Sequence, residues 1–106
     1  MPTPTVRMVK LSGDLDIGVL PNASRMLRAL DNADVAVIDM RSVTYLDSAA
    51  LGMLMAARQR IHEAGGHLRI VSADPRLQRL LNVTGINRSV TVYSSLDDAL
   101  DVGTND

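Results

Sequence analysis

Residues 35–71 decide the fold, because three segments of different character follow one another there. The first is the apolar run V-A-V-I at 35–38, typical of a parallel strand that is covered on both faces. The second is D-S-A-A-L-G-M-L-M-A-A-R-Q-R-I-H-E-A-G-G at 47–66, which predicts a helix over about 49–64, because the Gly65-Gly66 pair at its end supplies a left-handed C-cap. The third is L-R-I-V at 68–71, a further strand. This order predicts a parallel β-α-β unit with a right-handed crossover.

The same alternation of strand and helix begins upstream of this unit. Residues 6–11 predict a strand with apolar side chains on both faces, which ends at Ser12-Gly13. Apolar residues then recur at helical spacing as far as Leu30, and Pro21 suits the first turn of that helix.

The alternation also continues downstream. Asp74-Pro75 is an N-cap followed by proline at the first helical position, and Ser89 to Tyr93 is expected to form a fourth short strand. Ser95 and Asp98 have the spacing of a capping box that opens a last helix. The fold class is therefore α/β, with about four mostly parallel strands and four helices.

Length and composition indicate one cytoplasmic domain over residues 1–106, with residues 1–4 and 103–106 expected to be frayed. The chain has no cysteine, so a disulfide framework and a thiolate metal site are excluded, and we expect no metal and no cofactor. Residues 1–5 lack the charged and apolar regions of a signal peptide, and no apolar stretch is long enough to span a membrane, so we expect neither a signal peptide nor a membrane span. A net charge of −1 and only two aromatic residues disfavour direct binding of nucleic acid.

The turn at Asp47-Ser48 is the main candidate for a functional site. Ser48 is expected to be the N-cap of the helix that follows, a position where serine is among the preferred residues. A helix N-terminus also offers free N–H groups and the positive end of the helix dipole, both of which suit a phosphate. Phosphorylation of Ser48 would therefore change the surface and leave the fold intact.

The helix after this turn has two faces that differ in composition. At 100° per residue, one face is apolar and is expected to lie in the core, and the other lies on the side of Ser48. The core face comprises Ala50, Leu54, Ala57 and Ile61, and the face of Ser48 comprises Gly52, Met55 and Gln59. Met55 is either adaptable surface or a contact for a binding partner.

Catalysis is not expected, so no catalytic residue is assigned. A hydrolase would need a base beside Ser48, but His62 lies about four helical turns away and His67 lies beyond it. The chain has no phosphate-binding glycine motif. Asp39 follows an apolar strand as a phospho-accepting aspartate does, but the acids and the lysine that would accompany it are not evident.

Taken together, three stretches resemble the STAS domain family, and specifically the bacterial anti-sigma factor antagonists. They are L-S-G-D-L-D at 11–16, V-T-Y-L-D-S-A-A-L-G-M-L at 43–54, and the C-terminal part of the chain. The last contains G-G-H-L-R-I-V at 65–71, P-R-L-Q-R-L-L-N-V-T-G at 75–85 and Y-S-S-L-D-D-A-L at 93–100. These motifs occur in the order that is typical of the family and span most of the chain.

The resemblance implies a regulator that acts by partner switching. The unphosphorylated antagonist binds an anti-sigma factor, commonly a GHKL-type serine kinase, and thereby releases a sigma factor. The kinase phosphorylates the serine that matches Ser48 and so breaks the complex, and a PP2C-type phosphatase reverses this step. Asp47 matches the aspartate before the phosphoserine, and Asp14 and Asp16 match acidic positions beside it, so we expect all three to contact the partner.

Two departures from the family pattern and one alternative function accompany this resemblance. Ala49 and Ala50 stand where the family commonly has Ser or Thr and then Gly. Relatives usually have a further N-terminal strand, so the sheet is expected to be one strand short, with an exposed edge that a homodimer or a partner could cover. The alternative is a STAS subunit of a lipid-transport ABC complex or a stressosome-like scaffold, which would need no kinase cycle.

Overall fold

The structure is a computed structural model that describes residues 3–102, and in this range it has four strands, four α-helices and two 3₁₀ helices. The expected fraying of residues 1–2 and 103–106 concerns residues outside this range. In chain order the elements are β1 Val6–Leu15, α1 Leu20–Leu27, η1 Arg28–Leu30, β2 Val35–Leu46, α2 Ser48–Glu63, β3 His67–Val71, α3 Pro75–Val83, η2 Ile86–Arg88, β4 Thr91–Tyr93 and α4 Leu96–Leu100.

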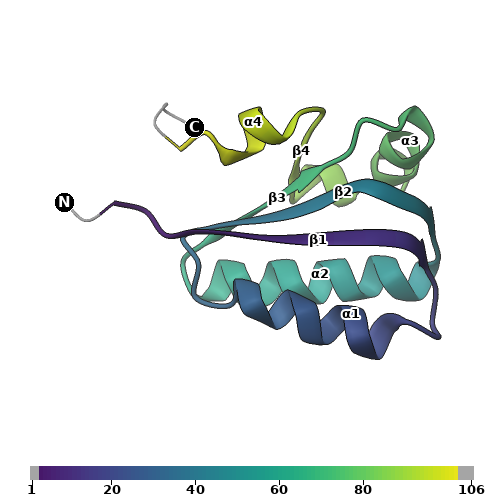
Figure 1. Ribbon diagram of the computed structural model, residues 1–106, viewed down its shortest axis with the longest axis horizontal. Helices are drawn as coiled ribbons and strands as arrows, with labels where there is room; N and C mark the ends of the chain where they lie inside the picture. The colour runs from purple at the N-terminus through teal and green to yellow at the C-terminus, as the bar shows by residue number, and fades with distance from the viewer. Residues whose placement is uncertain (1–2, 103–106) are drawn as a thin grey trace.

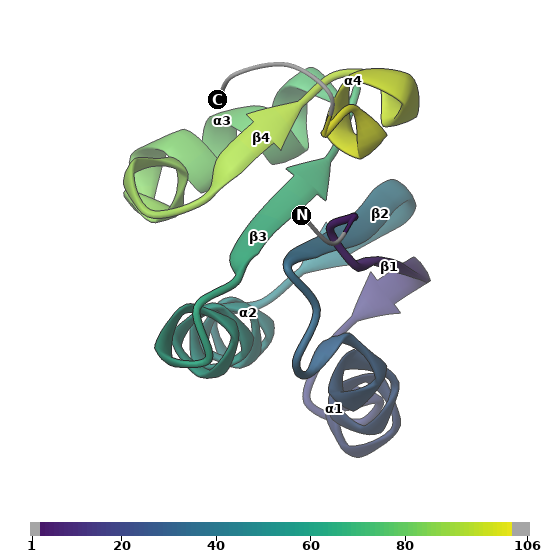
Figure 2. The ribbon, with the colours of Figure 1, turned by 90° about the vertical axis from the view of Figure 1, so that its left-hand side faces the viewer.

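The four strands form one parallel sheet in the order β1-β2-β3-β4. Helices α1 and α2 lie side by side on one face of this sheet, and α4 lies on the other (Figure 1). The view along the strands shows β4 and α3 at the far side from β1 (Figure 2). The α/β class and the parallel sheet predicted from the sequence are confirmed.

Two apolar clusters hold the layers together. The larger one lies between the sheet and helices α1, α2 and α3, and it includes the fully buried side chains of Leu27, Ile38, Leu54 and Leu81. The smaller one lies under α4 on the opposite face, where Ala99 packs with valines of β2 and β3. The helices therefore cover one face almost completely and the other face only around α4.

Strands β1 and β2 are both longer than the sequence predicts. Strand β1 does not end at Ser12-Gly13, because Gly13 adopts a left-handed backbone conformation with φ +74°, which lets the strand pass through an irregularity and continue to Leu15. Strand β2 continues beyond the V-A-V-I run to Leu46, with Met40, Val43 and Leu46 facing the core. Strand β4 begins at Thr91 and not at Ser89, because the amides of Ser89 and Val90 both donate to the carbonyl oxygen of Ile86 in the 3₁₀ helix η2.

Two buried charged side chains lie on the face that α4 covers. Asp39 is almost fully buried and forms a bidentate ion pair with Arg41, with Nε–Oδ1 and Nη2–Oδ2 distances of 2.9 Å. The hydrogen bonds from Arg41 hold the pKa of Asp39 below its usual range. Arg69 in β3 donates to the carbonyl oxygens of Ala99 and Asp101, and so ties the end of α4 to the sheet.

Strand β1 lies at one edge of the sheet. Within residues 3–102 it pairs with β2 alone, over a register that runs from Val6 opposite Val35 to Leu15 opposite Leu46. The sheet thus has four strands with β1 at its edge, as the sequence predicts, and the edge strand is ten residues long.

Candidate functional site

Asp47, and not Ser48, is the N-cap of helix α2. The backbone of Asp47 is extended, and its Oδ1 accepts a hydrogen bond of 2.9 Å from the amide of Ala50. Its Oδ2 accepts a second bond of 3.1 Å from the amide of Ile17, in the loop between β1 and α1. The prediction that Ser48 caps the helix is wrong, because Asp47 is also a good N-cap residue and only its carboxylate can satisfy both segments at once.

Ser48 is the first residue of α2, and its side chain is exposed. Its hydroxyl is therefore free of the capping role and lies at the positive end of a helix of 16 residues. Since the cap is supplied by the neighbouring carboxylate, a phosphate on Ser48 would remove no hydrogen bond that holds the helix end. The arrangement suits reversible modification without a change of fold.

The outward face of α2 is open along the line that starts at Ser48. Gly52 and Gln59 are exposed, and Met55 retains 37% of its accessible surface. A Cβ atom added at Gly52 would have no neighbour within 4 Å, so nothing in the described chain covers the helix there. Gln59 donates to Glu63 one turn further along, at 3.1 Å. The structure thus places Ser48, Gly52, Met55 and Gln59 together on one accessible surface, the outer α2 face.

A shallow hollow borders the outer α2 face on the side of α3. It measures about 190 Å³ and lies between Gly52 and Met55 of α2 and Thr84 and Gly85 at the end of α3. Val83, beside it in sequence, is one of the most exposed apolar side chains in the described range. Sequence reasoning did not find these α3 residues as part of the site. In the sequence, Gly85 is only the last residue of the stretch 75–85, and nothing local indicates which helix the turn after α3 adjoins.

Asp14 and Asp16 occupy different places relative to Ser48. Asp16 lies in the turn after β1, where its Oδ1 accepts from the amide of Gly18 at 2.9 Å, next to the Ile17 amide that binds Asp47. Asp14 belongs to β1, and its Oδ1 accepts from the Thr44 hydroxyl at 2.7 Å. Because the next residue of β1 is buried beneath the helices, Asp14 points to the opposite face of the sheet. The structure groups Asp16 and Asp47 with Ser48, and Asp14 lies apart from them.

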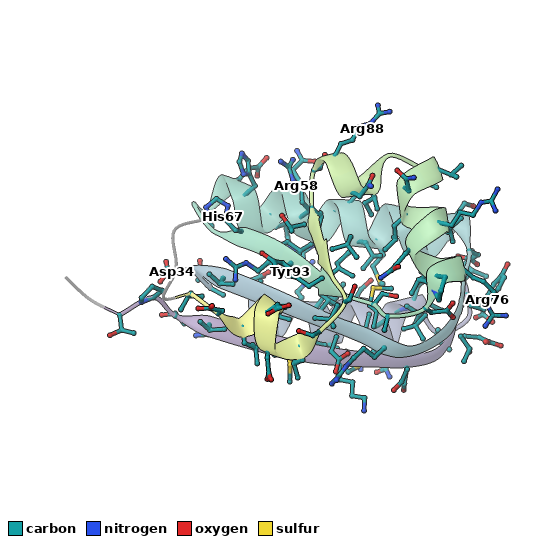
Figure 3. The ribbon with its side chains drawn as sticks, turned by 90° about the horizontal axis from the view of Figure 1, so that it is seen from above. Asp34, Arg58, His67, Arg76, Arg88 and Tyr93 are labelled. Carbon is teal, nitrogen blue, oxygen red and sulfur yellow. The ribbon has the colours of Figure 1, made fainter. Side chains whose placement is uncertain are left out.

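The histidines lie far from Ser48. His62 is fourteen residues further along α2, which corresponds to about 21 Å along the helix axis. His62 and His67 instead line a hollow of about 380 Å³ beside β3 and β4, together with Arg58 and Tyr93. Figure 3 shows His67 towards one end of the molecule and Arg76 at the other end. Neither histidine can act as a base towards the Ser48 hydroxyl in this arrangement.

Comparison with known families identifies the class of this domain. The family model described as STAS domain matches residues 2–99. The chain therefore belongs to the STAS domain family, and the resemblance predicted from the three sequence stretches is confirmed. Within residues 3–102, no helix is both long enough and apolar enough to cross a membrane.

The chain is also similar to individual proteins of known name. It is 28% identical over 102 residues to the anti-sigma F factor antagonist of Paenibacillus polymyxa, a match that covers 90% of this chain and 84% of that protein. The crystal structure of an anti-sigma factor antagonist from Mycobacterium paratuberculosis matches with a TM-score of 0.82 and 27% identity, over 94% of this chain and 86% of that chain.

A transporter-related protein has the same fold. The crystal structure of a sulfate transporter family protein from Wolinella succinogenes matches with a TM-score of 0.78, over 90% of this chain and 81% of that chain. At 22% identity this likeness concerns the fold alone.

Proposed function

We propose that this STAS domain is an anti-sigma factor antagonist that acts by partner switching, with Ser48 as the switch. The observation that carries the proposal is the exposed Ser48 hydroxyl at the start of α2, next to a cap that does not depend on it. The names of the relatives from Paenibacillus polymyxa and Mycobacterium paratuberculosis support the same function.

The partner in this proposal is an anti-sigma factor that is also a GHKL-type serine kinase. It docks on the outer α2 face and on Asp16 and Asp47, with Asp14 at the periphery, and a PP2C-type phosphatase removes the phosphate. The whole chain, residues 1–106, acts in the cytoplasm as one non-enzymatic domain without cofactor or metal. The free edge of β1 is where a homodimer would form.

Electrostatic repulsion is sufficient to make Ser48 a switch. A phosphate adds a charge of roughly −2 beside Asp47. A carboxylate on the partner about 6 Å away, in a medium of effective dielectric constant about 40, is repelled by about 3 kcal/mol. This corresponds to about a hundredfold loss of affinity. Since Ser48 is exposed, the free energy of unfolding changes little.

The proposal is tested with purified proteins from the genome that encodes this chain. Each candidate anti-sigma kinase is mixed with the chain, and binding is measured without ATP and after incubation with ATP. One kinase should bind the unmodified chain, add one phosphate at Ser48 and then dissociate. The variant Ser48→Ala should bind and remain unphosphorylated, and Ser48→Glu should bind about tenfold more weakly, because it adds one charge where the phosphate adds two.

Two results would contradict the proposal. Phosphate that is still incorporated into Ser48→Ala would place the modification elsewhere. Binding to none of the anti-sigma kinases, together with tight binding to an ABC ATPase, would favour the transport function over the switch.

A further inference from the structure

Strand β2 has a free edge of its own in the half that leads to Ser48. Its pairing with β3 ends at Asp39 opposite Val71, whereas its pairing with β1 continues to Leu46. In the described part of the chain, residues 40–46 therefore have a strand neighbour on one side only. Such an edge presents backbone donors and acceptors that only another extended backbone can match well.

Two irregularities explain why β2 and β3 separate there. Between Lys10 and Ser12, and again between Gly13 and Asp14, β2 carries one residue more than β1. A bulged strand bends and twists locally, so β2 turns away from the line of β3. The chain after Val71 then leaves the sheet to start α3, and the space beside β2 stays open.

A groove of about 310 Å³ occupies this space. One wall consists of four consecutive residues of β2, Val43 to Leu46, and the other of α3 residues as far as Leu80 together with the cap of that helix. Consecutive residues of a strand point to opposite faces, so a hollow lined by four in a row lies against the strand's edge. Leu46, Leu77 and Leu80 make its interior apolar, and Tyr45 stands 55% exposed beside it.

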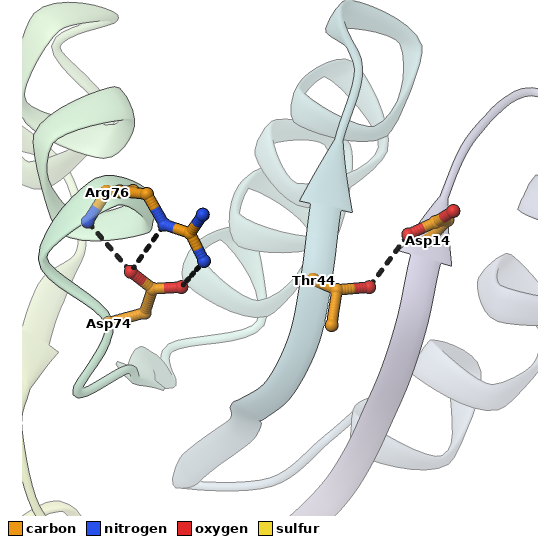
Figure 4. Close-up of polar contacts among 4 residues, drawn as sticks. All are labelled: Asp14, Thr44, Asp74 and Arg76. Atoms are coloured by element: carbon orange, nitrogen blue, oxygen red, sulfur yellow. Dashed lines mark hydrogen bonds and ion pairs between the residues drawn. The ribbon is translucent and has the colours of Figure 1, made fainter.

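The rim of the groove carries a cation. Figure 4 shows Asp74 and Arg76 at the start of α3, across the gap from Thr44 on β2. The guanidinium of Arg76 is paired with Asp74 at 3.3 Å, but the Arg76 side chain is 89% exposed. An exposed pair of this kind contributes little to stability, so the guanidinium can also bind a carboxylate of a partner.

We propose that this groove binds an extended segment of the protein partner, which adds to the edge of β2 at residues 43–46 as a short strand. An apolar side chain of the segment lies between β2 and Leu77 and Leu80, and an acidic side chain of the segment pairs with Arg76. Strand addition of this kind takes affinity from main-chain hydrogen bonds and specificity from side-chain pockets.

The groove lies next to the switch along the chain. Leu46 lines it, and the next two residues are the helix cap Asp47 and Ser48. A partner that contacts both places would have one contact at Ser48 that phosphorylation weakens and a second contact in the groove that lies further from the phosphate. The identity of the partner as the anti-sigma factor rests on the proposed function, whereas the binding of an extended segment in the groove does not.

The test uses the whole chain and two probes. The first probe is a phage-displayed library of linear ten-residue peptides, selected on the unmodified chain. Enriched peptides should contain an acidic residue near an apolar one, and should slow amide hydrogen exchange at residues 43–46. Arg76→Glu should weaken their binding about tenfold and Tyr45→Ser about fivefold, with the melting temperature retained because both side chains are exposed. Arg88→Glu, the same charge reversal at an exposed position of η2 outside the groove, is the matched control and should leave peptide binding unchanged.

The second probe is the anti-sigma kinase from the binding experiment above, which should compete with the peptides and lose affinity for Arg76→Glu. Binding of the kinase that depends on Ser48 but not on Arg76 or Tyr45 would overturn the groove proposal and leave the switch intact. Peptide binding without binding of any kinase would overturn the proposed switch and leave the groove proposal intact. A library without enriched peptides, or protection of residues 43–46 that arises from self-association of the chain alone, would also overturn the groove proposal.

Discussion

Helix α2 has sixteen residues, and its two faces differ in burial and in composition. The inward face consists of small and aliphatic side chains without accessible surface, packed against the sheet. The outward face consists of a hydroxyl, a glycine, a partly exposed methionine and an amide. The first face contributes to the core, whereas the second is exposed and takes no part in that packing. A phosphorylation switch needs this separation.

The largest effect is expected on the inward face. Leu54 is fully buried between the sheet and the helices, so Leu54→Ala removes apolar contacts and leaves a cavity. We expect the free energy of unfolding to fall by about 3 kcal/mol. Chemical denaturation with urea measures this directly. The matched control is Gln59→Ala on the exposed face of the same helix, which should change stability by less than about 0.5 kcal/mol.

If the two variants lost similar amounts of stability, the division of α2 into a folding face and a binding face would be wrong. The folded fraction of Leu54→Ala should bind the anti-sigma partner as tightly as the original chain does. Weaker binding by that folded fraction would show that the two faces are coupled.

The inward face of α2 could be predicted from the sequence because it depends on local periodicity alone. Ala50, Leu54, Ala57 and Ile61 recur at helical spacing, and all four are buried. The N-caps at Asp74 and Ser95 could be predicted for the same reason, because a cap bonds to amides two or three residues away.

The parts of the site that depend on distant segments could not be predicted. The choice between Asp47 and Ser48 as the cap is decided by the Ile17 amide, thirty residues upstream of Asp47. The groove beside β2 depends on where β3 stops pairing and on extra residues in β2 that have no local signature. The position of Gly85 and Gly52 around one hollow likewise depends on where the turn after α3 lies relative to α2.

Loss of the helix cap should lower the free energy of unfolding by less than loss of a core side chain. This prediction distinguishes Asp47 from Ser48. Asp47→Ala removes the bonds to the amides of Ala50 and Ile17, so we expect a loss of about 1–2 kcal/mol in the free energy of unfolding. Ser48→Ala should cost less than about 0.5 kcal/mol, because that side chain is exposed and does not cap the helix. Thermal unfolding of both variants gives the comparison. If Ser48→Ala lost more free energy of unfolding than Asp47→Ala, the serine and not the aspartate would be the N-cap.

The smallest effect is expected for one methionine on the outward face, and it appears in binding and not in stability. Met55→Lys places a charge on the outer α2 face, where we expect the affinity for the anti-sigma partner to fall about fivefold, because a desolvated ammonium opposes docking. Met26→Lys is the matched control, since Met26 is 41% exposed against 37% for Met55 but belongs to α1. Both variants should keep their melting temperature. Equal losses of affinity for the two variants would mean that binding depends on the net charge of the domain. A loss confined to Met55→Lys would locate docking on the outer α2 face.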